Sequence, residues 1–203
     1  MECRGYYPDT AHKRYFDYYL GMIIHKGKII DARLLKEEAL ESGSEDIDSV
    51  VVREIASFRN DRAYADMRAL FVHEYGAEMQ EKELFSTETV YGDWCGFGGS
   101  PPPYKEQMDT LVAHNDRAGI VAWLQSASIE KQVYAFDACH DMKLKGIKLS
   151  PEEQRLCKLI SKKKGLIQTC GGCLYGAEDI REVISGIKKK KEVGVIGSYR
   201  WEE

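Results

Sequence analysis

The segment from Asp116 to Gly165 constrains the fold most, because it carries three helix-forming patterns in succession. The first pattern is short, and the link Ser126-Ala127-Ser128 leads from it into a longer pattern that begins at Ile129. The third begins at Ser150-Pro151-Glu152-Glu153, where a capping hydroxyl, a proline that needs no amide partner and a glutamate that reaches back form a helix start. The segment therefore predicts three consecutive helices with short connections.

The longest of these three patterns is apolar on two sides, as a helix packed between neighbours requires. The small residues Ala135 and Ala138 would let a neighbouring helix approach closely. Cys139 in this pattern and Cys157 in the next are expected to be small apolar core residues. The remaining apolar positions are Val133, Tyr134, Phe136 and Met142.

The N-terminal part of the chain also shows apolar residues at helical spacing. The stretch that ends at Gly27 is aromatic and apolar on all sides, which predicts a buried helix capped by Asp9 or Thr10. Helices are likewise predicted over residues 32–41, 47–58 and 62–75, the last with a cap at Asn60-Asp61. Downstream, the patterns predict helices over 105–113 and 177–187, a short extended run over 166–169, and a lone strand or ordered tail over 193–199.

The pattern Leu124-x-Ser126-x-Ser128, continued by Gln132, Val133, Ala135, Ala138, Cys139 and Met142, resembles a HEAT-like helical repeat. The resemblance is best over residues 116–165 and implies a right-handed stack of helix pairs that is used for protein contacts. We therefore expect a mainly all-α fold, either an antiparallel HEAT-like helix-pair stack or an irregular helical bundle. At most a minor β element is expected near the C-terminus.

A Gly/Pro-rich loop at residues 90–104 divides this expected single domain, residues 1–203, into an N-terminal helical part and a C-terminal HEAT-like part. Long ordered loops inside compact domains are often functional. The loop is therefore the first place to look for a site. The alternative is a linker that Trp94 and Phe97 pin down.

Cys170 and Cys173 enclose two glycines, follow an extended run and precede a helix. This arrangement resembles the redox site of thioredoxin-like proteins, in which the helix N-terminus lowers the pKa of the first thiol. One such pair supplies two of the four ligands that zinc requires, and Cys139 and Cys157 are the candidates to complete a site. A structural pair, a metal site and a redox site all remain open.

The pattern Tyr91-Gly92-x-x-Cys95-Gly96-x-Gly98-Gly99, followed by His114, resembles the calcium loop and catalytic helix of calcium-dependent secretory phospholipases. The resemblance implies backbone carbonyls that bind calcium and a role for His114 in activating water. Asn115 stands where that family has an aspartate, and Asp116 comes one residue late. Cys95 and His114 are the candidate site residues of this segment.

The formal net charge of −4 gives no reason to expect nucleic acid or an anionic membrane as a partner. No apolar run is long enough to span a membrane, and the N-terminus lacks an apolar signal core. As written, the chain is expected to be cytoplasmic, although a removed signal peptide would leave the same sequence.

These observations favour a protein-binding or scaffold module that has a protein partner, no cofactor, no bound metal and no catalysis of its own. Two enzyme alternatives stay open. They are a thiol- or metal-dependent activity at Cys170 and Cys173, and a calcium-dependent hydrolase that uses residues 91–114.

Overall fold

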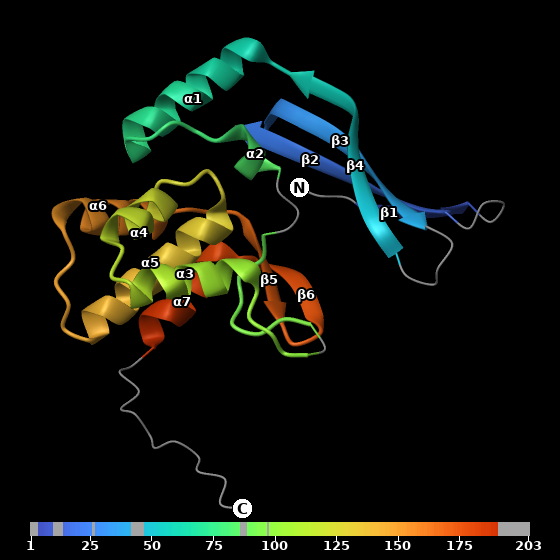
Figure 1. Ribbon diagram of the computed structural model, residues 1–203. Helices are drawn as coiled ribbons and strands as arrows, with labels where there is room; N and C mark the ends of the chain where they lie inside the picture. The colour runs from blue at the N-terminus through green and yellow to red at the C-terminus, as the bar shows by residue number, and fades with distance from the viewer. Residues whose placement is uncertain are drawn as a thin grey trace, which may run out of the picture. The chain divides into compact units, whose positions relative to one another are not determined.

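The computed structural model describes residues 4–9, 14–25, 27–41, 47–85, 89–96 and 98–190, and the chain divides into two compact units, Met1–Glu74 and Tyr75–Glu203. The described residues form a four-stranded antiparallel sheet, a two-stranded sheet and seven helices (Figure 1). The predicted mainly all-α fold is therefore wrong. No helix in these ranges is both long and apolar enough to cross a membrane.

The N-terminal unit is built on a four-stranded antiparallel sheet in the order β1-β2-β3-β4, followed by helix α1. The element bounds are Arg4–Asp9 for β1, Arg14–His25 for β2, Lys28–Glu41 for β3, Ile47–Arg59 for β4 and Asp61–Tyr75 for α1.

The helices predicted up to Gly27 and over 32–41 and 47–58 are strands β2, β3 and β4, so these three predictions are wrong. A run of tyrosine, phenylalanine and isoleucine favours a strand, and a run that is apolar on all sides fits a sheet as well as a buried helix. Gly27 has φ +74° and, because His25 pairs with Lys28, lies in the turn between β2 and β3. A helix end and a hairpin turn both favour glycine at positive φ, so this residue does not distinguish between them.

A buried ion pair fixes the end of this sheet to the start of α1. Asp31, which is 1 % exposed, accepts hydrogen bonds from Arg59 Nε at 2.9 Å and Nη2 at 2.6 Å. The Arg59 guanidinium also lies 3.9 Å from the centroid of the Tyr64 ring on α1. Asn60 caps α1 as predicted, since its Oδ1 accepts from the Ala63 amide at 3.1 Å.

The C-terminal unit holds the remaining helices and a β-hairpin. The bounds are Glu81–Leu84 for α2, Pro103–Ala113 for α3, Arg117–Leu124 for α4, Ile129–Leu144 for α5, Pro151–Ile160 for α6, Leu166–Gly171 for β5, Leu174–Asp179 for β6 and Ile180–Lys189 for α7.

The three helices predicted over 116–165 are α4, α5 and α6, and each has a side-chain cap at its start. Asp116 accepts from the Gly119 amide, Ser128 from the Lys131 amide, and Ser150 forms a capping box with Glu153. The β5–β6 hairpin follows α6 directly, so these helices do not continue into a stack of helix pairs. The HEAT-like assignment is therefore wrong. Residues 193–199, predicted as a strand or tail, lie outside the described residues.

Helix α5 is the centre of the C-terminal core, and it packs against α3, α4, α6, α7 and β5. Gln132 on α5 is fully buried and donates to the carbonyl oxygens of Leu124 and Ser126, at 3.3 Å and 2.7 Å, which fixes the turn from α4. Arg117 on α4 donates to Glu153 on α6 through Nε at 2.6 Å and through Nη2. The fully buried apolar side chains around α5 include Ile120, Leu124, Val133, Leu156, Ile160, Ile167 and Ile180.

Candidate functional site: a disulfide-clamped hairpin

Two tyrosines fasten the start of the Gly/Pro-rich loop to α5. The hydroxyl of Tyr134 lies 3.0 Å from the Val90 carbonyl oxygen and 2.9 Å from that of Gly92, and it accepts from the Gly92 amide at 3.0 Å. The hydroxyl of Tyr91 donates to Asp137 Oδ2 at 2.9 Å. Because Tyr134 and Asp137 lie about one turn apart on α5, the helix presents both contacts on one side.

The same loop runs parallel to β5 and bonds to it at both ends. The Tyr91 amide donates to the Gln168 carbonyl at 2.8 Å, and the Cys170 amide donates back to the Tyr91 carbonyl at 3.0 Å. Farther along, the Gly172 amide donates to the Trp94 carbonyl at 2.9 Å. The loop therefore behaves as a short third strand beside the hairpin.

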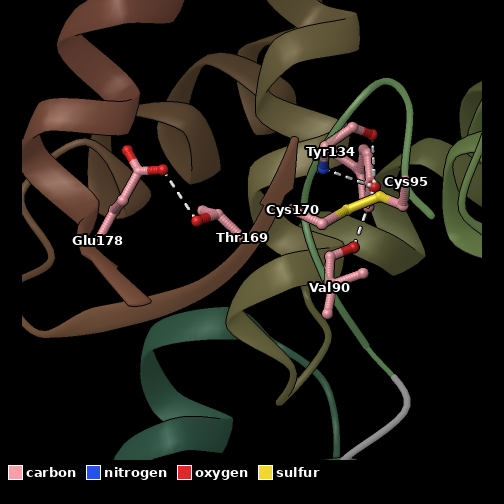
Figure 2. The surroundings of a disulfide bond; sticks show 7 residues. Val90, Cys95, Tyr134, Thr169, Cys170 and Glu178 are labelled. Atoms are coloured by element: carbon pink, nitrogen blue, oxygen red, sulfur yellow. Dashed lines mark hydrogen bonds between the residues drawn. A yellow bond between two sulfur atoms is a disulfide. The ribbon is translucent and has the colours of Figure 1, made fainter. Parts of the chain in front are cut away.

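A disulfide between Cys95 and Cys170 closes this arrangement (Figure 2). The two residues are 75 apart in sequence, with a Cα–Cα distance of 5.6 Å. In the chain-entropy model, a cross-link across a loop of this length stabilises the fold by about 4 kcal/mol. Gly92 lies against the bond, because a Cβ at that position would be 2.3 Å from the Cys170 carbonyl oxygen. Only glycine fits there without displacing the loop.

The structure brings together some of the predicted site residues and separates others. Cys170 is bonded to Cys95 and not to Cys173, whose thiol is free and exposed in the hairpin turn. His114 lies at the end of α3, exposed, with Nδ1 2.9 Å from the Thr110 carbonyl oxygen, and is bonded to neither cysteine of the disulfide. Within the described ranges, no group of three or more His, Cys, Asp or Glu side chains is placed to hold a metal ion.

The other two described cysteines lie in the core, as expected. Cys139 on α5 and Cys157 on α6 are free and buried, and their thiols share a hydrogen bond. That hydrogen bond and burial raise the pKa of the Cys139 thiol. A thiol held protonated and buried in this way is a poor nucleophile.

A cavity of about 230 Å³ lies beside the loop, against α5. Asp137 lines it and is bonded by Lys190 Nζ, which lies 2.7 Å from each of its carboxylate oxygens. Burial and the Asp137 charge raise the pKa of Tyr91, and the same two causes raise the pKa of Asp141. The cavity is smaller than the roughly 300–1,000 Å³ of most ligand pockets. Because Tyr91 and Lys190 satisfy Asp137, we interpret this cluster as the anchor of the loop.

Tyr134 and Asp137 position the loop, and this role was not predicted from the sequence. Asp137 carried a signal in the sequence, because a carboxylate in the middle of an apolar helical run requires a partner when buried. The partner, Tyr91, is 46 residues away in sequence, so only the tertiary structure identifies it.

The outer strand of the hairpin, β6, is open to solvent. Every residue of β6 up to Glu178 is exposed, including Leu174 at 79 % and Tyr175 at 64 %, and Trp94 on the adjoining loop is 61 % exposed. We call Trp94, Leu174 and Tyr175, together with the outer edge of β6, the display surface. A large exposed apolar side chain is unremarkable alone. Leu174 and Tyr175 are consecutive strand residues and point to opposite faces, so apolar side chains are exposed on both faces at this end of the clamped hairpin, which indicates a contact region.

The outer edge of β6 presents unused backbone groups. Tyr175 pairs with Cys170 and Ala177 pairs with Gln168 across the hairpin. The Cys170 N–H and the Gln168 C=O are hydrogen-bonded to the backbone of Tyr91, so the backbone groups of these two residues point away from β6. In an antiparallel ladder, two residues that face each other direct their backbone N–H and C=O groups either both toward the partner strand or both away from it. The N–H and C=O groups of Tyr175 and Ala177 therefore point outward, away from β5. Within the described part of the chain, no backbone bond from another element reaches them.

The comparisons with known proteins give no relative for this arrangement: no protein-family model, no curated protein and no solved structure matches the chain.

Proposed function

We propose that the C-terminal unit is a protein-binding module and that the display surface is its recognition surface. The observation that carries this proposal is the exposure of Trp94, Leu174 and Tyr175 on backbone that is fixed by a disulfide and by hydrogen bonds. Exposed aromatic and leucine side chains on rigid backbone bind at a low entropic cost, because little conformational freedom is lost on association.

The open edge of β6 favours an extended polypeptide as the bound partner. A peptide strand that adds to a sheet edge gains main-chain hydrogen bonds, while pockets or exposed side chains beside the edge supply specificity. Tyr175 and Ala177 offer the main-chain groups, and Leu174 and Tyr175 offer the side chains. Both parts of such a recognition mode are therefore present in β6.

A random-peptide display library selected against the full chain tests this proposal. Selected peptides are expected to lose at least about tenfold in affinity for a Leu174→Ser, Tyr175→Ser double variant, as contact residues of a binding surface do. Leu166→Ser is the matched control, because Leu166 is 69 % exposed but lies at the far end of the hairpin. Failure to select any peptide, or equal affinity for the double variant, would contradict the proposal.

A second candidate function is thiol–disulfide exchange, and the exposed free thiol of Cys173 beside the Cys95–Cys170 bond favours it. Attack by a thiolate on a neighbouring disulfide needs an accessible thiol of this kind. The test is the reduction of insulin by dithiothreitol, with and without the protein. Acceleration by the wild-type chain and not by Cys173→Ser would support this function, and no acceleration would remove it.

A further inference from the structure

The outer edge of β6 is complementary to itself, and we propose that two copies of this chain associate by antiparallel β6–β6 pairing centred on Gly176. This inference rests on the proposed binding role of the display surface and names one partner for it, a second copy. The result is a continuous sheet in the order β5-β6-β6-β5 across the two copies.

The register follows from the outward backbone groups. With Gly176 on the two-fold axis, Tyr175 of one copy lies opposite Ala177 of the other, and Ala177 opposite Tyr175. These are the two residues whose N–H and C=O groups point outward, so each such pair exchanges both of its backbone hydrogen bonds. A register centred on Ala177 also lies inside β6, but it pairs Tyr175 with Asp179, the N-cap of α7. The carbonyl of an N-cap residue accepts the first hydrogen bond of its helix, so that pair could not exchange both backbone hydrogen bonds.

The side chains fit the same register. Gly176 faces its own copy at a position where opposed Cα atoms are about 4.5 Å apart, and a Cβ built on Gly176 meets nothing within 4 Å in the single chain. The exposed ring of Tyr175 lies over the small side chain of Ala177 on the other copy. A two-stranded hairpin is marginally stable as an isolated sheet, and the pairing makes it part of a wider sheet.

Charge favours the antiparallel arrangement. The acidic residues of β6, Glu178 and Asp179, both lie at its C-terminal end, and the N-terminal end carries the uncharged Leu174. Antiparallel pairing places Glu178 opposite Leu174 of the second copy, whereas parallel in-register pairing would place Glu178 against Glu178. Thr169 Oγ1 already donates to the Glu178 carboxylate at 2.8 Å. The carboxylate therefore keeps a hydrogen bond when Leu174 of the second copy lies opposite it.

Sedimentation of the full chain tests the association. The wild type is expected to be a dimer and Ala177→Pro a monomer, because proline removes the outward amide and leaves the inner ladder with β5 intact. Ala177→Val keeps that amide and is expected to remain a dimer. A wild type that is monomeric at the highest attainable concentration, or an Ala177→Pro variant that still forms the dimer, would overturn the inference.

A cross-link tests the register. In a Cys3→Ser, Cys173→Ser background, Gly176→Cys is expected to form a covalent dimer under mild oxidation. Gly186→Cys is the matched control, since an added Cβ there also meets nothing within 4 Å but the residue lies on α7. Equal cross-linking of the two variants would overturn the register.

The failure of this inference is separable from that of the proposed function. If the chain is monomeric but binds selected peptides through Leu174 and Tyr175, only the second copy is wrong as the partner. If it is monomeric and binds no such peptide, both proposals fail.

Discussion

Helix α5 and strand β6 belong to the same unit but hold their positions in opposite ways. The helix is buried without interruption from Gln132 to Cys139, with neighbours on several sides. The strand β6 is exposed along almost its whole length and has one neighbouring strand. The position of β6 therefore depends on groups outside it: the disulfide, the parallel loop and the tyrosines that anchor that loop on α5. A strand with so little burial and so much external support is suited to display.

This contrast predicts that the clamp makes a large contribution to stability. Replacing both Cys95 and Cys170 with alanine is expected to lower the free energy of unfolding by about 4 kcal/mol, because the cross-link no longer restricts the unfolded chain. Urea denaturation of the oxidised wild type and of the double variant measures the difference. A loss below about 1 kcal/mol, under the usual range for a native disulfide, would show that the loop and α5 hold the hairpin without it.

The next largest effect is expected inside the helical frame. In Arg117→Met, the carboxylate of Glu153, which is 1 % exposed, loses its charged partner and keeps the hydrogen bond from the Ser150 amide. Removal of one member of a buried pair costs about 3 kcal/mol. Arg155→Met is the comparison, because the Arg155–Glu152 pair on the same helix is largely exposed and such pairs contribute about 0–1 kcal/mol. Equal losses in the two variants would mean that the Arg117–Glu153 pair is not part of the frame.

The same pair predicts a pH dependence. Burial alone would raise the pKa of Glu153, but the hydrogen bonds from Arg117 and Ser150 lower it overall. A carboxyl group with a lowered pKa in the folded state stabilises above the ordinary glutamate pKa, and this contribution is lost as the pH falls through the lowered value. Arg117→Met removes the arginine contribution to this lowering, so the variant has less of this stabilisation to lose and its difference from the wild type is expected to narrow in acid. Urea titrations across the acid range check this, and a difference that widens there would contradict it.

A smaller effect is expected where the loop meets the disulfide. Gly92→Ala would place its Cβ against the Cys170 carbonyl oxygen, and overpacking of this kind costs about 1–3 kcal/mol. Gly98→Ala in the same loop meets its nearest atom at 3.9 Å and serves as the control. Thermal unfolding of both variants makes the comparison. A Gly92→Ala variant as stable as Gly98→Ala would show that the loop yields without cost.

The smallest effect on stability is expected on the display surface. Leu174→Ala should change the free energy of unfolding by no more than about 0.5 kcal/mol, because the side chain is 79 % exposed. The same substitution at Leu124, which is fully buried, should cost about 2–5 kcal/mol. Urea denaturation measures the free energy of unfolding of Leu174→Ala and Leu124→Ala. Similar losses in the two variants would refute the contrast between the helical frame and the display surface.

Local signals in the sequence were sufficient for the helical frame. A cap such as Ser150 is recognised by residues within one turn of it, so the starts of α4, α5 and α6 were predictable. The N-terminal sheet was not, because the choice between helix and strand for β2, β3 and β4 depends on pairing partners that lie elsewhere in the chain.

The site depends on non-local contacts even more. The nearest cysteine to Cys170 in sequence is Cys173, yet Cys170 is bonded to Cys95, which is 75 residues away. Cys95 was a candidate through the resemblance to a calcium loop, and the 90–104 loop was a candidate because long ordered loops are often functional. The strand β6 was not predicted, since its Gly176, Ala177 and Asp179 are residues that strands disfavour.

Hydrogen exchange of single backbone amides tests the central claim most directly, that β6 presents an open edge on a clamped hairpin. At a concentration where the chain sediments as a monomer, the Tyr175 and Ala177 amides are expected to exchange rapidly. The Cys170 and Gly172 amides, which donate to the carbonyl oxygens of Tyr91 and Trp94, are expected to exchange slowly. Protection of Tyr175 and Ala177 equal to that of Cys170 would show that the edge is already covered within one chain, and would contradict the account.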